Sequence, residues 1–184
     1  KDNKIKTFMD FGAGSGVKTE AVKNILKLKD KNVYALDKKE FESVDNTKYE
    51  YNFNYIYYDG LSYPSFDIKF DLITCIQVLH HIFEIDHTIK YLKSILKKGG
   101  LLIIKEHKID DNKNTSMLID IEHSLYELGQ NKNTKFLNTY YARYFTELEF
   151  LRLMTINGFI YIPIPEEKFD DNNPTNYIYY MFTI

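Results

Sequence analysis

The sequence contains a single cysteine, Cys75, among its 184 residues. One thiol cannot form an internal disulfide, and it excludes a zinc site built from several cysteines. A chain that has no disulfide suits a reducing compartment, so we expect it in the cytoplasm.

Long apolar runs and excess positive charge are also missing. No run approaches the roughly 20 apolar residues that span a membrane, and no signal-peptide pattern opens the chain, so we expect no membrane partner. The formal net charge of −2 gives no overall field for nucleic acid, and an RNA site would have to be a local patch. Tryptophan is absent and arginine is rare beside lysine, a composition typical of AT-rich coding DNA such as that of some viruses.

Glycine is scarce as well, yet three of the eight glycines fall within five residues, at Gly12, Gly14 and Gly16. A strand that leads through Gly-x-Gly-x-Gly into a helix lets the backbone approach a ligand, and the helix start supplies amide donors. The dinucleotide pattern Gly-x-Gly-x-x-Gly does not fit, because Val17 holds the place of its last glycine. No Gly-Lys-Ser/Thr follows, which excludes a P-loop.

The rest of the chain alternates strand-like and helix-like segments, which predicts a parallel α/β sheet. We expect strands at 7–12, 32–37, 54–60, 70–77 and 101–107, followed by a terminal hairpin of 159–165 and 176–184. We expect helices at 17–29, 85–98, 114–129 and 146–159, with caps at Thr115 or Ser116 and at Thr146, and with Gly99 and Gly100 ending the second.

Two further strands end in an acid, Asp37 and Asp59. Asp37 follows the glycines by about twenty residues, where a carboxylate pairs with the ribose hydroxyls of a nucleoside. Asp59 ends the next strand, where a carboxylate can accept from an adenine amino group. Because ligands of open parallel sheets lie beyond the carboxyl ends of the strands, these features point to one ligand site.

The segments DFGAGSG, ALD, YYDG, FDLITCIQVLHHI and LKKGGLLIIKEH occur in this order. Together they resemble the class I S-adenosylmethionine-dependent methyltransferases. The resemblance implies an α/β, Rossmann-like fold with a seven-stranded, mostly parallel sheet and an antiparallel last strand. It also implies S-adenosylmethionine as cofactor and one methyltransferase domain over 1–184. The family usually has helices before its first strand, so we expect a fragment or the C-terminal module of a longer chain.

By this resemblance, the methionine part of the cofactor would lie against Asp10, Gly12 and Gly14, the ribose against Asp37 and the adenine against Asp59. The full set of expected cofactor-binding residues is Asp10, Gly12, Ala13, Gly14, Gly16, Asp37, Lys38, Asp59, Gly60 and Gln77.

The methyl acceptor is suggested by two longer segments. FDLITCIQVLHHIFE resembles a segment of messenger-RNA cap guanine-N7 methyltransferases, although Leu-His-His also occurs in small-molecule methyltransferases. Residues 105–127 resemble a Lys/Arg-Glu-His-Asp…His-x-Leu-Tyr pattern of capping enzymes from large cytoplasmic DNA viruses and linear plasmids. This implies capped RNA as substrate, linked or associated capping domains, and a location in a virus factory or host cytoplasm.

Guanine N7 carries no proton, so no catalytic base is required and none is assigned. A flat base needs aromatic faces and an acceptor for its edge. The substrate-binding candidates are His80, His81, Glu106, His107, Tyr141 and Tyr177. We expect no metal site, because no pair of the five histidines has tight ligand spacing with cysteines. Two alternatives stay open: methylation of a small molecule or another nucleobase, and a non-catalytic methyltransferase-fold subunit.

Overall fold

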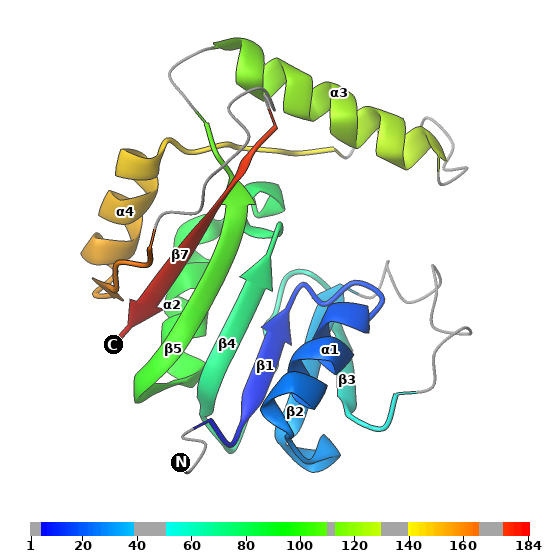
Figure 1. Ribbon diagram of the computed structural model, residues 1–184, viewed down its shortest axis with the longest axis vertical. Coiled ribbons are helices and arrows are strands. Elements are labelled where there is room, and N and C mark those ends of the chain that lie inside the picture. The colour runs from blue at the N-terminus through cyan, green and yellow to red at the C-terminus, as the bar shows by residue number, and fades with distance from the viewer. Residues whose placement is uncertain (1–4, 39–50, 110–112, 130–139, 166–174) are drawn as a thin grey trace.

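Seven strands form one sheet in the order β3-β2-β1-β4-β5-β7-β6 in the computed structural model (Figure 1), which describes residues 5–38, 51–109, 113–129, 140–165 and 175–184. Strands β1 to β5 run parallel to their neighbours, β7 is antiparallel to β5, and β6 is antiparallel to β7. The expected mostly parallel sheet and its closing hairpin are therefore confirmed. The strands are β1 Phe8–Phe11, β2 Val33–Lys38, β3 Asn54–Tyr58, β4 Phe70–Ile76, β5 Leu96–His107, β6 Ile160–Tyr161 and β7 Tyr177–Thr183.

The four α-helices of the described residues are α1 Val17–Leu26, α2 Ile85–Ile95, α3 Lys113–Gly129 and α4 Glu147–Ile156. The sheet has a separate apolar core on each face. One core packs Val22 and Leu26 of α1 onto Phe8 and Val33, and the other joins α2 and α4 to the opposite face. Figure 1 shows α3 lying beyond the end of the sheet towards which β1, β4 and β5 point. None of these helices is long and apolar enough to cross a membrane.

The helix expected at 85–98 ends earlier than predicted. Helix α2 stops at Ile95 and the chain passes directly into β5 at Leu96, so the expected role of Gly99 and Gly100 as a helix end is wrong. Both glycines belong to β5, beside an irregularity in its pairing with β4. Leu96 is fully buried, and burying it opposite Phe70 takes precedence over the local helix pattern.

The predicted helix caps are correct for one helix and wrong for another. Thr146 forms a capping box: its hydroxyl accepts from the amide of Glu149, whose carboxylate accepts from the Thr146 amide at 2.9 Å. Helix α3 instead begins at Lys113, before both expected caps. Thr115 is buried inside its first turn, and so it cannot be the residue that precedes the helix.

The start of β1 is held by the side chain of Asp71, at the beginning of β4. Its Oδ2 accepts from the amides of Lys6 and Thr7 at 2.8 and 2.9 Å and from the Thr7 hydroxyl at 3.0 Å. Its Oδ1 accepts from Lys97 Nζ at 2.8 Å. One carboxylate therefore ties the entries of β1, β4 and β5 together at the end of the sheet opposite the glycines.

We expect Asp71→Ala to lower the free energy of unfolding by about 2 kcal/mol, or about 4–8 °C in Tm, because these donors lose a shared partly buried acceptor. The exposed Asp67 provides a matched control, and Asp67→Ala should change stability by less than about 0.5 kcal/mol. Urea and thermal unfolding measure both. Equal losses in the two variants would contradict the proposed clamp.

Candidate functional site

The glycine-rich turn after β1 has the backbone geometry that only glycine adopts readily. Gly12 and Gly14 have φ angles of 75° and 56°. A Cβ added to Gly12 would lie 2.2 Å from Cγ2 of Val78, whereas one added to Gly14 would meet no atom within 4 Å. Gly12 is therefore required by packing against the loop after β4, while Gly14 has open space beside it.

Asp10 lies beneath this turn and is only 3% exposed. Its Oδ2 accepts from the Thr19 hydroxyl of α1 and its Oδ1 accepts from the Thr74 hydroxyl of β4, each at 2.6 Å. Burial raises the pKa of Asp10 even though both threonine hydrogen bonds act in the opposite direction. The fold thus holds a desolvated carboxyl group directly behind the glycine turn.

The end of β2 meets the same turn. Asp37 Oδ2 accepts from the Gly14 amide at 2.5 Å, and its Oδ1 accepts from the Lys38 amide at 2.7 Å. From β3, the Tyr55 hydroxyl donates to the Gly14 carbonyl. The first three strands therefore meet at one residue, Gly14. The approach of Asp37 to Gly14 was expected from the sequence, whereas the contact from Tyr55 was not.

Asp59 and Gly60 form the turn after β3. Asp59 Oδ1 accepts from the amides of Leu61 and Ser62, both at 2.8 Å, and these bonds lower the pKa of its exposed carboxyl group. A Cβ on Gly60 would lie 3.3 Å from Cε of Lys38, so this turn packs against the end of β2. The structure places Asp59 beside the expected site, and its contact with adenine stays a prediction.

A row of aromatic side chains on and before β3 was missed by the sequence analysis. Tyr51, Phe53, Tyr55 and Tyr57 occupy alternate positions, and successive ring centroids are 4.7, 6.4 and 4.5 Å apart. Tyr51 and Phe53 also lie where a side chain on Gly16 would project. The alternation of aromatic residues at 51–57 could have predicted this row, because a strand places every second residue on the same face.

The loop after β4 closes the other side of the turn. Gln77 has a φ of 59°, which is rare for a residue other than glycine, and its amide donates to the Lys105 carbonyl at 2.8 Å. Ala13, which is buried, donates its amide to the Leu36 carbonyl at 3.2 Å. Backbone strain like that at Gln77 is concentrated at functional sites. Here it sets the direction in which the loop leaves β4.

Glu106 on β5 fixes the same loop from the opposite side. It is 8% exposed, and its Oε1 accepts from the amides of Val78 and Leu79 at 3.2 and 2.8 Å. Its Oε2 lies 2.5 Å from Nδ1 of His80. Three hydrogen bonds within the protein use this carboxylate, so it positions the loop, and its contact with a methyl acceptor stays a prediction.

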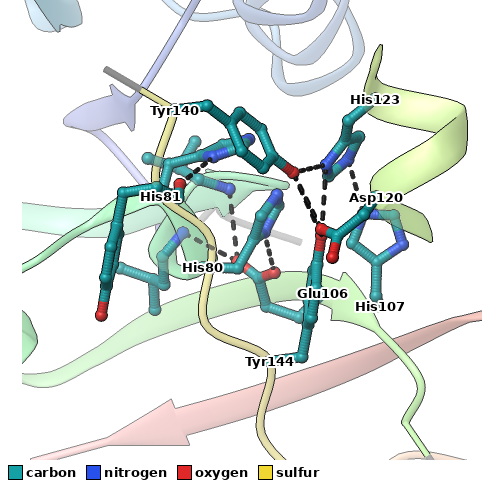
Figure 2. A network of polar contacts seen from close by, with 11 residues as sticks. His80, His81, Glu106, His107, Asp120, His123, Tyr140 and Tyr144 are labelled. Carbon is teal, nitrogen blue, oxygen red and sulfur yellow. Dashed lines mark hydrogen bonds and ion pairs between the residues drawn. The ribbon is translucent and has the colours of Figure 1, made fainter. Parts of the chain in front are cut away.

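Four of the five histidines gather beside Glu106 (Figure 2). His80 and His81 come from the short 3₁₀ turn Leu79–His81, His107 ends β5, and His123 projects from α3. The His80 ring centroid lies 4.0, 5.0 and 5.2 Å from those of His81, His107 and His123. One ring nitrogen from each of His80, His81 and His123 lies within 4.8 Å of the others.

Two tyrosines and an aspartate complete this cluster. The Tyr140 hydroxyl contacts His123 Nδ1 at 2.8 Å and donates to Asp120 Oδ1 at 3.2 Å. The Tyr144 hydroxyl also donates to Asp120 Oδ1, at 2.7 Å. Figure 2 shows these groups converging from α3 and from the chain before α4.

Burial lowers the pKa of His107 to about 3, and the neighbouring His80 and His123 act in the same direction. Burial, followed by the effect of His80, also lowers the pKa of His123. Both rings are therefore neutral at pH 7, and each then has one nitrogen lone pair available to a proton donor or a metal ion.

The remaining expected substrate residues lie at the edges of the cluster. The Tyr141 carbonyl is 3.0 Å from His81 Nδ1, and its ring meets that of Phe83 edge to face at 5.2 Å. The Tyr177 ring lies 5.0 Å from that of His107. All six candidates are thus placed around one region, and Phe83, which is 77% exposed, adds an apolar surface to it.

Comparison with known proteins agrees with this architecture. A family described as "Methyltransferase domain" matches residues 1–163. No curated protein matches the chain in sequence.

Among solved structures, an S-adenosylmethionine-dependent methyltransferase from Clostridium acetobutylicum is similar, with a TM-score of 0.66 and 16% identity over 100% of this chain and 86% of the other. Another from Mesorhizobium loti has a TM-score of 0.67 and 12% identity, covering 97% and 90%. Human N-acetylserotonin methyltransferase in complex with S-adenosylmethionine has a TM-score of 0.63 and 15% identity, covering 98% and 48%. Because these sequence identities are low, the structural similarity establishes only that the chain has the same fold as these proteins.

The buried Asp10 predicts how stability depends on pH. Because its pKa is raised in the folded chain, its contribution to stability is full below the ordinary pKa of 3.8 and is lost as pH rises through the folded value. Asp10→Asn removes this loss, so we expect the stability of the variant relative to wild type to increase from about pH 4 to pH 7. Urea unfolding across this range tests it, with exposed Asp67→Asn as control. A difference independent of pH would show that Asp10 is not desolvated.

Proposed function

The chain belongs to the methyltransferase domain family, and on that premise we propose that it methylates N7 of the messenger-RNA cap guanine. The enzyme class is S-adenosylmethionine-dependent methyltransferase, and the cap guanine is our proposal for the acceptor. The observation that carries this proposal is the group of exposed ring-bearing side chains that follows β4, next to the glycine turn.

The methyl donor suits the three strand ends that meet at Gly14. Its ammonium group can pair with the desolvated carboxyl of Asp10, and its methionine chain can pass through the open space beside Gly14. The ribose hydroxyls can donate to Asp37 in place of the Gly14 amide that now donates to it. Pairing with the ammonium group would offset the desolvation of the buried Asp10 carboxyl group.

Methyl transfer needs positioning more than proton chemistry. When bound, the donor would supply a methyl group to the lone pair of guanine N7, and the bonding pair of its carbon–sulfur bond would remain on sulfur as a neutral thioether. N7 has no proton to lose, so the protein contributes orientation and exclusion of water. The strained Gln77 and the loop held by Glu106 supply a rigid edge for this alignment.

A planar base can stack on the rings beside this edge. Phe83 and Tyr141 meet edge to face, and His81 is tied to the Tyr141 backbone, so these rings support one another. Stacking of a base on aromatic side chains contributes about 1–3 kcal/mol per base. A charged, methylated guanine would also gain from electron-rich tyrosine faces.

A second candidate function is methylation of a hydroxyl group on a small molecule, and the pairing of His80 with Glu106 favours it. With its Nδ1 proton donated to the carboxylate, His80 would present an Nε2 lone pair, and Nε2 has no hydrogen-bond partner among the described residues. An oriented histidine of this kind is suited to take a proton from a hydroxyl acceptor.

The donor site can be tested with a matched pair of glycines. Gly14 and Gly99 both have positive φ angles, and a Cβ at either position meets no atom within 4 Å, but Gly99 lies at the entry of β5. Gly14→Ala and Gly99→Ala should each cost about 1 kcal/mol of stability. Only Gly14→Ala should weaken S-adenosylmethionine binding, by at least about tenfold, because its methyl group enters the donor space. Calorimetry measures both affinities, and equal affinities in the two variants would argue against this placement.

The acceptor can be tested by comparing capped RNA, uncapped RNA and a phenolic small molecule as substrates for the same protein. We expect methyl transfer to capped RNA, located at N7 by nuclease digestion and mass spectrometry. His80→Asn keeps a polar group near Glu106 and removes Nε2, so the rate should fall less than about tenfold for N7 transfer. A fall of about 10²–10⁴, or transfer to the phenol alone, would favour the hydroxyl acceptor instead.

A further inference from the structure

We propose that His80, His81 and His123 form a binding site for one divalent first-row transition-metal ion, with Zn²⁺ as the best fit. One ring nitrogen of each lies within 4.8 Å of the others, although His123 comes from a different part of the sequence. Figure 2 shows His80, His81 and His123 gathered between the turn after β4 and helix α3. Imidazole nitrogen is a preferred ligand for Zn²⁺, Co²⁺ and Ni²⁺, and three such ligands are a common zinc set.

The separations require only small side-chain movements. Ligand nitrogens lie about 2.0–2.1 Å from zinc, so two ligands of a tetrahedral ion are about 3.3 Å apart. His80 is fixed by Glu106, whereas His81 is exposed and His123 is half-buried. The two rings with more freedom can therefore close on the one that is held in place.

The nitrogens opposite the proposed ion already have partners. His80 Nδ1 is held by Glu106 and His81 Nδ1 contacts the Tyr141 carbonyl at 3.0 Å. A carbonyl oxygen can only accept, so His81 carries its proton on Nδ1 and leaves Nε2 with a lone pair. Carboxylate or carbonyl partners of this kind orient metal-binding histidines and raise their basicity.

His80 supplies a second and independent observation. The residue is 2% exposed, and its Nε2 has no hydrogen-bond partner among the described residues. Leaving a buried polar atom unsatisfied costs about 1–3 kcal/mol, and such an atom in a native protein calls for an explanation. A metal ion bound to this nitrogen would satisfy it.

His123 is the ligand whose contacts change on binding. Its Nδ1 contacts the Tyr140 hydroxyl at 2.8 Å, and its Nε2 lies 3.2 Å from Nε2 of His107. An ion bound to His123 would replace one of these two contacts. Asp120, joined to Tyr140, adds negative charge next to the site.

The metal site is compatible with a ring-nitrogen acceptor, which needs no base. An ion on His80 Nε2 occupies the lone pair that a general base would use, so it is incompatible with His80 as a base.

The test uses the full chain without an affinity tag, stripped of metal and titrated with Co²⁺. We expect saturation at one Co²⁺ per chain, with intense visible bands typical of tetrahedral coordination, and displacement of Co²⁺ by Zn²⁺. His81→Ala and His123→Ala should each weaken Co²⁺ binding by at least tenfold. His87→Ala is the matched control, because His87 is 59% exposed on α2 and outside the cluster, and it should bind as wild type does.

Absence of saturable binding, weak bands typical of octahedral coordination, or unchanged affinity in both cluster variants would overturn the proposal. If His123→Ala fails to fold, the exposed His81→Gln carries the same test. S-adenosylmethionine binding, measured on the same samples, should be retained in the cluster variants. Loss of Co²⁺ binding with the donor still bound supports the metal site, whereas loss of the donor alone would count against the methyl-transfer proposal.

Discussion

The buried carboxylate of Glu106 is the group on which the functional end of the sheet depends. It accepts from two consecutive amides and lies against the ring of His80, so it fixes the loop that leaves β4. Val78 in that loop packs onto Gly12, and His80 faces the other histidines. A single acid on β5 thus sets the distance between the glycine turn on one side and the histidine cluster on the other.

The two ends of the sheet differ in whether their polar groups and backbone stabilise the fold. At the end away from the site, Asp71 accepts hydrogen bonds from four donors on three residues and stabilises the strand entries. At the other end, Asp10 is buried and has a raised pKa, and Gln77 has a left-handed backbone. A desolvated carboxyl group and a strained backbone each cost folding free energy. This cost is tolerated where the surrounding core fixes the conformation, and ligand binding can then offset part of it.

The sequence was sufficient to predict a mostly parallel sheet and the meeting of Gly14 with Asp37, because both follow from local pattern and from the geometry of parallel strands. It was insufficient where tertiary packing takes precedence over local preference. The glycines at 99 and 100 are typical of a helix end, yet burial of Leu96 draws them into β5. The sequence placed His80, His81 and His107 in one region, but the addition of His123 was missed because only the tertiary position of α3 brings it to them.

The same contrast explains why the donor is easier to assign than the acceptor. Donor contacts come from strand ends and backbone amides, whereas the acceptor region combines three distant segments whose side chains have several possible roles. His80 is the clearest case, because its Nε2 has one lone pair that can accept a proton or bind a metal ion, but not both at once. A ring-nitrogen acceptor needs neither role, so for that acceptor the lone pair is left free for an ion. For a hydroxyl acceptor, the same ion would have to replace the base by lowering the pKa of the hydroxyl that it binds. The occupancy of this one nitrogen therefore connects the identity of the acceptor with the presence of a metal.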